Sequence, residues 1–385
     1  MSVYSVSSVG NSSEKLPIAI IGGGITGLAA AHRLARQGIP FRLFEASPRL
    51  GGNIRTERDP SGWLLEAGPN SLQLTPALAA LLAELGLTAV TASPAAKNRY
   101  IVRNGRAVAA PASPPALLTT RLFTLAAKLR LLGDLFHRPR QRPADASLAD
   151  FIASHVGREL VDYGLRPFVS GVYAGDAQKL SARHSFPSLW EAERTHGSLI
   201  RAQIAAAKAK RSRGEPSGPP PIFSFSDGLE TLTRALAASL PTASVELNAH
   251  VTSLVPGPPW KVIWHPAASN SPLPAPRSEL FQSVVLALPA AALADLVFKS
   301  DSDSQLSALS SQLSTRPLAD LSHVEYPPVS SLFLGYKREH VTHPLDGFGM
   351  LVPPAEQRSI LGVLFNSTLF PNRAPAGHVA LTVMT

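Results

Sequence analysis

The pattern of apolar positions opens with a strand, a glycine turn, a helix and a second strand. Residues 18–21 are an unbroken apolar run, residues 27–37 carry apolar positions at helical spacing, and residues 41–45 form another short apolar run. This order is typical of a βαβ unit with a parallel sheet. A further helix is predicted over residues 76–85, because the helical spacing there stops at Gly86.

A helical region with mixed apolar and basic character begins near residue 111. Leucine and phenylalanine recur at helical spacing through residues 117–135, with arginine and lysine between and after them. The region predicts either a membrane-attachment element, whose cations meet anionic lipid, or a core helix with a basic outer face. The sequence supports both interpretations equally. Residues 208–221 are polar and proline-rich, and they predict a break after the helices.

The remaining chain is rich in strands. Residues 251–255, 261–264 and 281–288 predict a three-stranded meander with a long loop over 266–278, and later strands are predicted over 330–336, 359–365 and 378–383. The predicted fold class is therefore α/β, with a discontinuous Rossmann-like nucleotide domain, a mixed β-sheet substrate domain and an inserted helical domain. The predicted ranges are 1–15 for a disordered lead-in, 16–95 and 222–295 for the nucleotide domain, 96–110 and 296–385 for the substrate domain, and 111–221 for the helical domain.

Composition and charge narrow the class of protein. The chain has 385 residues, of which 45% are hydrophobic and 16% charged, so it predicts a folded globular protein with a large core. It has no cysteine, which excludes disulfides and thiolate metal sites. The net charge of +9 fits nucleic acid, an anionic membrane surface or an acidic small molecule. Nucleic acid is the weakest of the three, because no zinc-ligand spacing or aromatic-basic stripe accompanies the charge.

Neither a transmembrane segment nor a signal peptide is predicted. No run of apolar residues is long enough to cross a bilayer, and the serine-rich N-terminal tail lacks an apolar core. We therefore expect a cytoplasmic protein, peripheral on the inner face of a membrane if the basic helical region binds lipid. His340 and His343 stand close together, but no third ligand follows them, so no metal site is predicted.

The glycine turn after the first predicted strand is the first candidate binding site. Gly22, Gly24 and Gly27 form G-x-G-x-x-G: the first permits the tight turn, the second lets the backbone approach a pyrophosphate, and the third lets helix and strand pack closely. Glu45 ends the second strand, where its carboxylate would accept hydrogen bonds from an adenosine ribose and repel a 2′-phosphate. The pattern predicts a dinucleotide and argues against NADP.

A second glycine pair distinguishes flavin from nicotinamide. "RLGGN", residues 49–53, follows Glu45 directly, and "LEAGPNS", residues 65–71, offers another close turn. These additions resemble the flavoprotein superfamily of amine oxidases, phytoene desaturases and protoporphyrinogen oxidases, in which the glycine pair contacts FAD. The resemblance implies FAD as the cofactor. The candidate cofactor-binding residues are Gly22, Gly23, Gly24, Ile25, Thr26, Gly27, Glu45, Ala46, Arg49, Gly51, Gly52, Asn53, Gly68, Pro69, Asn70 and Val251.

Two later sequence blocks narrow the resemblance to one family within this superfamily. "RPFVSGVYAGDAQKLSARHSFPSLWEAERTHGSLI", residues 166–200, and "GFGMLVPPAEQRSILGVLFNSTLFPNRAPAGH", residues 347–378, resemble segments of the oxygen-dependent protoporphyrinogen oxidases, closest to the plant and bacterial branch. The resemblance runs from about residue 16 to the last residue. It implies flavin-dependent oxidation of protoporphyrinogen IX to protoporphyrin IX by dioxygen, in haem and porphyrin biosynthesis.

The resemblance also implies a substrate site. A flat, apolar macrocycle with propionates needs an apolar slot, backbone that comes close to the rings, and a cation. Residues 171–175 supply small side chains for such an approach, and Arg99 matches a family arginine that holds a propionate. For any single leucine in the set, core packing is the commoner explanation. The candidate substrate-binding residues are Arg99, Asn70, Ala174, Gly175, Leu345, Leu361 and Leu381.

No protein side chain is expected to act as a catalytic acid, base or nucleophile, because the flavin carries the difficult step. Three alternatives remain open: oxidation of coproporphyrinogen III, a flavin amine oxidase, and a non-catalytic flavin-binding protein. Family members usually continue beyond the equivalent of Thr385 with a segment that covers the flavin, so the resemblance implies a C-terminally truncated chain with weak FAD retention and little turnover. The expected partners are a porphyrinogen, dioxygen, a membrane surface and a second copy in a homodimer, and no nucleic acid.

Overall fold

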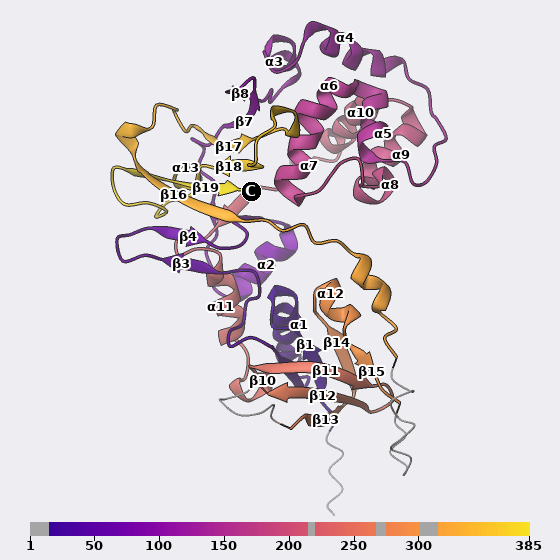
Figure 1. Cartoon of the computed structure of the whole chain (residues 1–385), viewed down its shortest axis with the longest axis vertical. Coiled ribbons are helices and arrows are strands. Elements are labelled where there is room, and N and C mark those ends of the chain that lie inside the picture. The colour runs from indigo at the N-terminus through magenta and orange to yellow at the C-terminus, as the bar shows by residue number, and fades with distance from the viewer. Residues whose placement is uncertain (1–14, 215–219, 267–274, 301–314) are drawn as a thin grey trace, which may run out of the picture. The chain divides into compact units, whose positions relative to one another are not determined.

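The computed structural model describes residues 15–214, 220–266, 275–300 and 315–385, and the chain divides into two compact units (Figure 1). Unit 1 comprises Met1–Arg55, Leu85–Leu87 and Glu230–Glu325, and unit 2 comprises Thr56–Glu84, Thr88–Leu229 and Tyr326–Thr385. Apart from Lys15, the predicted lead-in lies outside the described residues.

Unit 1 is built on a parallel four-stranded sheet in the order β10-β2-β1-β14. The predicted strand–turn–helix–strand is confirmed as β1, α1 and β2. β1 and β2 are buried on both faces, which explains their unbroken apolar sequences. The elements are β1 Ile18–Ile21, α1 Ile25–Arg36, β2 Phe41–Phe44, α11 Glu230–Ala238, η3 Thr242–Ser244, β10 Val245–Glu246, β14 Ser283–Leu286, α12 Ala290–Ala294 and η5 Ala319–His323.

A second sheet in unit 1 has the order β13-β12-β11-β15. Its strands are β11 Ala249–Val255, β12 Trp260–Pro266, β13 Arg277–Phe281 and β15 Val297–Phe298. Phe44 of the parallel sheet packs against Trp264 and Phe281 of the second sheet, with ring centroids 4.9 and 5.8 Å apart. One buried apolar cluster therefore joins the two sheets.

The predicted third strand of the meander, residues 281–288, is wrong. The meander closes with β13, which pairs with β12, and the chain then passes to the parallel sheet as β14 beside β1. The change takes place at Gln282, whose backbone N–H donates to the carbonyl of Pro17 at 2.9 Å. An apolar run alone could not show that the chain changes sheet within it. Residues 267–274 of the predicted loop lie outside the described residues.

Unit 2 contains a six-stranded mixed sheet in the order β16-β19-β18-β17-β7-β8, in which only the β17–β7 pair is parallel. β17 was not among the predicted strands. Smaller sheets are the ribbon β3-β4 and the three short strands β5-β9-β6. The elements are β3 Thr56–Arg58, β4 Leu64–Glu66, β5 Leu72–Gln73, α2 Pro76–Glu84, β6 Val90–Thr91, β7 Asn98–Arg103, β8 Arg106–Ala109, β9 Ile222–Ser224, β16 Ser331–Lys337, η6 Arg338–His340, β17 Gly347–Leu351, η7 Pro354–Glu356, β18 Gly362–Leu364, α13 Asn366–Leu369 and β19 His378–Met384.

The helical part of unit 2 extends from Pro114 to Ser212. Its elements are α3 Pro114–Thr119, α4 Leu125–Gly133, η1 Asp134–Phe136, α5 Leu148–Val156, α6 Arg158–Leu160, the π-helical turn η2 Val161–Leu165, α7 Arg166–Tyr173, α8 Ala182–Ser185, α9 Pro187–His196 and α10 Leu199–Ser212. α10 continues through residues 208–212, so the prediction of a break there is wrong, and residues 215–219 of the predicted break lie outside the described residues. A buried cluster around Phe151, Val169 and Leu199 holds these helices together. Within the described ranges, no helix combines the length and apolarity needed to cross a membrane.

The contacts divide the chain differently from the predicted domain ranges at two places. Residues 56–84, predicted in the nucleotide domain, belong to unit 2, where Glu66 of β4 accepts the backbone N–H of Leu229. Residues 296–325, predicted in the substrate domain, belong to unit 1, because β15 extends the sheet beside β11.

Candidate functional site

Two glycines of the turn after β1 leave no room for a side chain. A Cβ at Gly22, whose φ is +107°, would lie 2.4 Å from the carbonyl oxygen of Ala287. A Cβ at Gly27 would lie 1.8 Å from the carbonyl oxygen of Gly22. Gly24 is different, since its nearest neighbour would be 4.0 Å away. Gly22 therefore permits the turn to pass close to the chain that follows β14, Gly27 permits α1 to pack on that turn, and Gly24 keeps the N-terminus of α1 open.

The second glycine pair packs directly against the first turn. The backbone N–H of Gly51 donates to the carbonyl of Gly23 at 2.9 Å, and Gly24 and Gly51 form an isolated parallel bridge. A Cβ at Gly52 would lie 3.0 Å from Cα of Gly24. Arg49 holds this second turn, since its guanidinium donates to the carbonyl of Gly52 at 2.6 Å. The backbones of the two glycine turns thus meet at the start of α1.

Glu45 joins the first turn to the segment that leads into the second. One carboxylate oxygen accepts the backbone N–H of Gly23 at 2.6 Å, and the other accepts that of Ser47 at 2.8 Å. Each oxygen keeps a lone pair for a further donor, such as a hydroxyl group. The side chain is therefore oriented at the carboxyl end of β2, as the spacing of the motif predicted.

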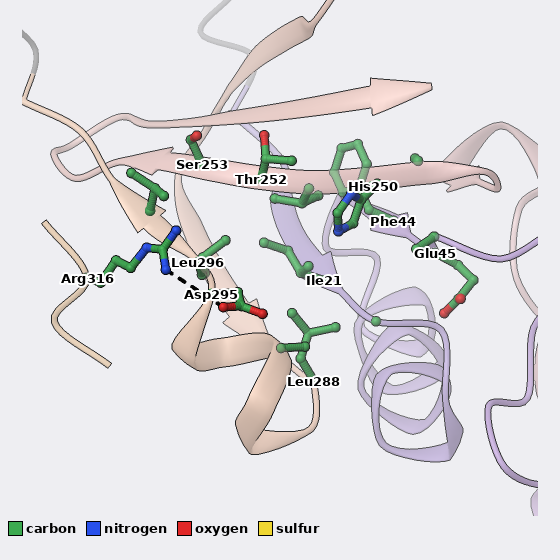
Figure 2. A pocket seen from close by; sticks show the side chains of 16 residues that line it. Ile21, Phe44, Glu45, His250, Thr252, Ser253, Leu288, Asp295, Leu296 and Arg316 are labelled. Carbon is green, nitrogen blue, oxygen red and sulfur yellow. Dashed lines mark ion pairs between the residues drawn. The ribbon is translucent and has the colours of Figure 1, made fainter. Parts of the chain in front are cut away.

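A cavity of about 480 Å³ lies beside these groups in unit 1, at the carboxyl ends of β1 and β2 (Figure 2). Its wall includes Gly22, Glu45, Ala46 and Val251 of the predicted set. A cavity at this edge of a parallel sheet is where doubly wound folds bind nucleotides. Its remaining lining residues, which the sequence did not single out, are Ile21, Phe44, Ala249, His250, Thr252, Ser253, Leu288, Ala292, Asp295, Leu296, Val297 and Arg316.

The wall opposite β1 comes from β11 and from the segment after β14. Figure 2 shows His250 near Phe44, and the ion pair between Asp295 and Arg316, whose nearest atoms are 3.8 Å apart, at the other end of the cavity. Leu288 follows β14, the third parallel strand that ends at this edge. Of these lining residues, Leu288 lies in the apolar run of residues 281–288, whose change of sheet the sequence did not show.

The other predicted cofactor residues have distinct positions. Ile25 and Thr26 form the first turn of α1, and Asn53 follows the second glycine pair; none of the three lines the cavity. Gly68, Pro69 and Asn70 belong to unit 2. Asn70 is buried there, and its side-chain oxygen accepts from the amide of Asn366 at 2.8 Å.

A second cavity, of about 430 Å³, lies within unit 2 between α7 and the six-stranded sheet. Arg99 is the one charged side chain among its described lining residues. Its guanidinium carbon lies 5.5 Å from the ring centroid of Phe348, which orients the cation beside an aromatic face. The described lining residues are Gln73, Arg99, Tyr100, Phe168, Gly171, Val172, Tyr173, Pro220, Ile222, Phe348, Gly349, Met350, Leu351, Gly362, Val363, Leu364 and Met384.

The strand that carries Arg99 is fixed by a polar cluster. The Tyr100 hydroxyl donates to Asp346 at 2.5 Å, and the Asn98 amide donates to the same carboxylate at 2.9 Å. Burial, followed by the hydrogen bond and charge of Asp346, raises the pKa of Tyr100. The hydrogen bond from Tyr100 lowers the pKa of Asp346. Asp346 is therefore the anion, and it ties β7 to the start of β17.

The structure brings some predicted substrate residues to this cavity and not others. Arg99 and the segment 171–173 line it, but Ala174 and Gly175 follow α7 outside the lining. Leu345 is buried in a core cluster with Tyr100 and Phe365, and Leu381 packs against that cluster. Leu361 contributes backbone contacts: its N–H donates to Met384, and its carbonyl oxygen would lie 3.8 Å from a Cβ at Gly171.

Outside the segment 171–175, the aromatic and aliphatic lining of this cavity was not predicted. Phe168, Val172 and Tyr173 extend from α7 and are exposed, whereas Phe348 and Leu351 come from β17. All five lie inside the two sequence blocks that carried the family resemblance. The available signal for these five residues was therefore the resemblance of the whole blocks and not any spacing between the residues.

Comparison with known proteins places these features in a family. The model of the flavin-containing amine oxidoreductase family matches residues 25–385. The chain is 32% identical to protoporphyrinogen oxidase 2 of Arabidopsis thaliana, with 93% of this chain and 72% of the relative covered. It is also 32% identical to the mitochondrial protoporphyrinogen oxidase of Nicotiana tabacum, covering 93% of this chain and 73% of that protein.

Solved structures agree on the fold. A crystal structure from Exiguobacterium sp. 255-15, provisionally named a protoporphyrinogen oxidase, superposes with a TM-score of 0.72 at 22% identity, covering 98% of this chain and 78% of that one. At that identity the likeness concerns the fold alone. The family model and the plant relatives establish membership: the chain belongs to the flavin-containing amine oxidoreductase family, in the branch formed by the protoporphyrinogen oxidases.

Proposed function

We propose that this chain oxidises protoporphyrinogen IX to protoporphyrin IX, with FAD as its cofactor and dioxygen as the final oxidant, in tetrapyrrole biosynthesis. Six hydrogen atoms leave the macrocycle in three two-electron steps, and three molecules of dioxygen are reduced to three of hydrogen peroxide. The observation that carries the proposal is the apolar cavity of unit 2, with Arg99 as the one cation among its described lining residues, in a chain of this family.

The residues of unit 1 fit the adenosine and pyrophosphate parts of FAD. Gly24 leaves the N-terminus of α1 open, where backbone N–H groups attract phosphate. Glu45 retains acceptor capacity for ribose hydroxyls, and Ala46 and Val251 line the adjoining cavity. When bound, FAD supplies the electron acceptor that these side chains do not provide.

The cavity in unit 2 suits a flat macrocycle. Phe168, Val172 and Leu351 supply apolar surface, and Arg99 supplies the positive charge for a propionate. Protoporphyrinogen has two propionates and coproporphyrinogen III has four. One cation among the described lining residues therefore favours protoporphyrinogen.

Anaerobic reduction of the bound flavin tests this function directly. Purified protein reconstituted with FAD is mixed with protoporphyrinogen IX, coproporphyrinogen III or a primary amine, and the loss of the flavin absorbance is followed. We expect the fastest bleaching with protoporphyrinogen IX. Faster bleaching by coproporphyrinogen III or by the amine would contradict the substrate, and no bleaching by any of them would indicate a non-catalytic flavoprotein.

We also propose that the helical part contacts an anionic membrane surface. Leu125, Leu129 and Leu132 on α4 and Phe136 on η1 are 71%, 60%, 45% and 84% exposed, respectively, and their spacing places them on one helix face. Arg121 and Arg130 are exposed on the same segment. Outward leucines with nearby cations are typical of an element that lies in the membrane interface.

Co-sedimentation with vesicles tests this contact. Binding to vesicles with anionic lipid, and less binding to neutral vesicles, is expected for the wild-type chain. Leu129→Glu should weaken binding about fivefold or more, since it places a charge at the apolar face. Leu280→Glu, at a partly exposed strand position of unit 1, is the matched control. The homodimer stays a prediction, to be tested by light scattering of the same preparation.

A further inference from the structure

A cluster of metal-ligating side chains lies in the helical part of unit 2, outside the lining of both cavities. Asp134 begins η1, His137 follows η1, and His155 is in the last turn of α5. None of the three has a role in the proposed oxidation. Asp134 is fully buried, His155 is 2% exposed, and His137 is half-buried.

The three potential ligand atoms converge on one point. Oδ1 of Asp134 lies 2.5 Å from Nδ1 of His155 and 3.3 Å from Nδ1 of His137. The two Nδ1 atoms are 3.4 Å apart. Ligands about 2.0–2.1 Å from a tetrahedral Zn²⁺ are separated from one another by about 3.3 Å. Two of the three separations already match that value, and the third needs a small outward shift of one side chain.

The groups behind the ligands are arranged as metal sites require. Nε2 of His155 lies 3.1 Å from Oε1 of Glu193, so this nitrogen can donate its proton while Nδ1 presents a lone pair. Glu193 is buried, and Arg142 holds it through hydrogen bonds of 2.7 and 2.8 Å.

Asp134 is fixed in the same way. Its Oδ2 accepts the hydroxyl of Ser198 at 2.7 Å and the backbone N–H of Ile200 at 2.9 Å. Only Oδ1 is therefore directed to the two imidazoles. A carboxylate with one oxygen tied back, and an imidazole whose far nitrogen donates to a carboxylate, are the usual supports of bound divalent metal ions.

We propose that Asp134, His137 and His155 form a binding site for a divalent first-row transition metal ion, with Zn²⁺ as the representative. Two imidazole nitrogens and one carboxylate oxygen are a donor set of that class, and not one for Ca²⁺ or Mg²⁺. The partial exposure of His137 lets water complete the coordination. The ion would join η1, which directly follows α4, to α5, so its role is structural and separate from the flavin chemistry.

Zinc binding to the full chain tests the proposal without using enzymatic activity. Chelator-treated, desalted protein at about pH 7.5 is titrated with ZnCl₂ against a chromophoric competitor, and the bound metal is counted after gel filtration. We expect one tightly bound Zn²⁺ per chain and a higher melting temperature, by about 3 °C, in excess Zn²⁺. X-ray absorption of the loaded protein should show two imidazole ligands.

His137→Gln removes one ligand from the half-buried position and leaves the buried pair intact, so the variant should fold. Its affinity for Zn²⁺ should fall about 100-fold or more, a loss at least as large as that for a supporting residue. His196→Gln, at an exposed histidine of α9, is the matched control and should retain wild-type affinity. If His137→Gln does not fold, His137→Asn takes its place. No retained metal in the wild type, equal affinities for the two variants, or fewer than two imidazoles would overturn the proposal.

Discussion

The two cavities are formed by different parts of the polypeptide. The cavity of unit 1 adjoins the glycine turn after β1, where a Cβ at Gly22 would clash with the backbone, and residues from β1, β2, β11 and the segment after β14 complete its wall. The cavity of unit 2 is lined by side chains from α7, β7, β17, β18 and β19. Substitutions at Gly22 or Gly27 should therefore displace the backbone, whereas substitutions at the side chains of the second cavity should change affinity by degrees.

The largest effect is expected at Gly27. Gly27→Ala places a Cβ 1.8 Å from the carbonyl oxygen of Gly22, so helix and strand must separate, and we expect a loss of about 3 kcal/mol in unfolding free energy together with loss of FAD. Gly24→Ala is the matched variant, because its Cβ meets nothing closer than 4.0 Å. It should retain the melting temperature and lose only FAD affinity. Differential scanning fluorimetry measures the melting temperature, and flavin absorbance per chain measures FAD retention. Equal melting temperatures for both variants would contradict the assignment of Gly27 to packing and of Gly24 to cofactor binding.

The second largest effect is expected at Arg99, on the KM for the substrate. Arg99→Met keeps the apolar stem and removes the charge, so KM for protoporphyrinogen should rise about 10- to 100-fold, the value of one or two charge-assisted hydrogen bonds. The change in kcat should be smaller, because the cation binds a group remote from the oxidised carbons. Arg106→Gln, on the neighbouring strand β8, is the control. Steady-state kinetics with an unchanged KM in Arg99→Met would exclude Arg99 from substrate binding.

A graded effect is expected at Gly171, where α7 approaches β17. The Cβ of Gly171→Ala would lie 2.4 Å from Cδ2 of Leu351, the flexible end of a side chain that can move aside. The cost should be about 1 kcal/mol in stability and several-fold in KM, because Leu351 turns into the cavity. Adding Leu351→Val removes the clashing carbon and should restore part of both losses. Strictly additive effects in the double variant would show that the two positions do not interact.

The smallest effect is a pH dependence at Glu159, remote from both cavities. Burial raises the pKa of this carboxyl group, but hydrogen bonds from Thr124 and Arg103 outweigh it, so the pKa lies below its ordinary 4.5. The depressed pKa means that the carboxylate stabilises the fold above about pH 4.5 and that this stability is lost as the pH falls through the folded value. Glu159→Gln should therefore lose less stability than the wild type between about pH 5 and pH 3. Chemical denaturation at each pH measures it, and parallel curves would refute the assignment.

The same contrast explains what the sequence could predict. Backbone constraints leave a recognisable sequence pattern, so the places of Gly22, Gly27 and Glu45 in the strand–turn–helix–strand unit could be predicted, and their contact with a cofactor stays a prediction. Side chains of the second cavity come from segments far apart in the chain, and no spacing rule connects Phe168 with Phe348. Leu345 illustrates the limit, since the same apolar residue serves equally as pocket wall or as core, and the structure buries it beside Tyr100.

The hydrophobic pattern was also a poor guide where strand pairing and helix packing decide the structure. The apolar run of residues 281–288 predicted one strand, but its first residue belongs to the antiparallel sheet and the others lead into the parallel one. The helical region had two interpretations, and the structure buries Leu122 and Phe123 while leaving Leu125 exposed. Periodicity identified an amphipathic segment without showing which apolar residues face the core.

The single residue between β13 and β14 has a consequence for how this chain can vary over evolutionary time. Gln282 alone separates Phe281, in register with Trp260, from Ser283, in register with Ile18. One inserted or deleted residue at this point would shift β14 by one position against β1 and exchange the two faces of that strand. Val284 and Leu286, which pack against the shared core of the two sheets, would then point away from it. Length changes should therefore be rare here among homologues, so this junction is a fixed reference point for aligning distant sequences.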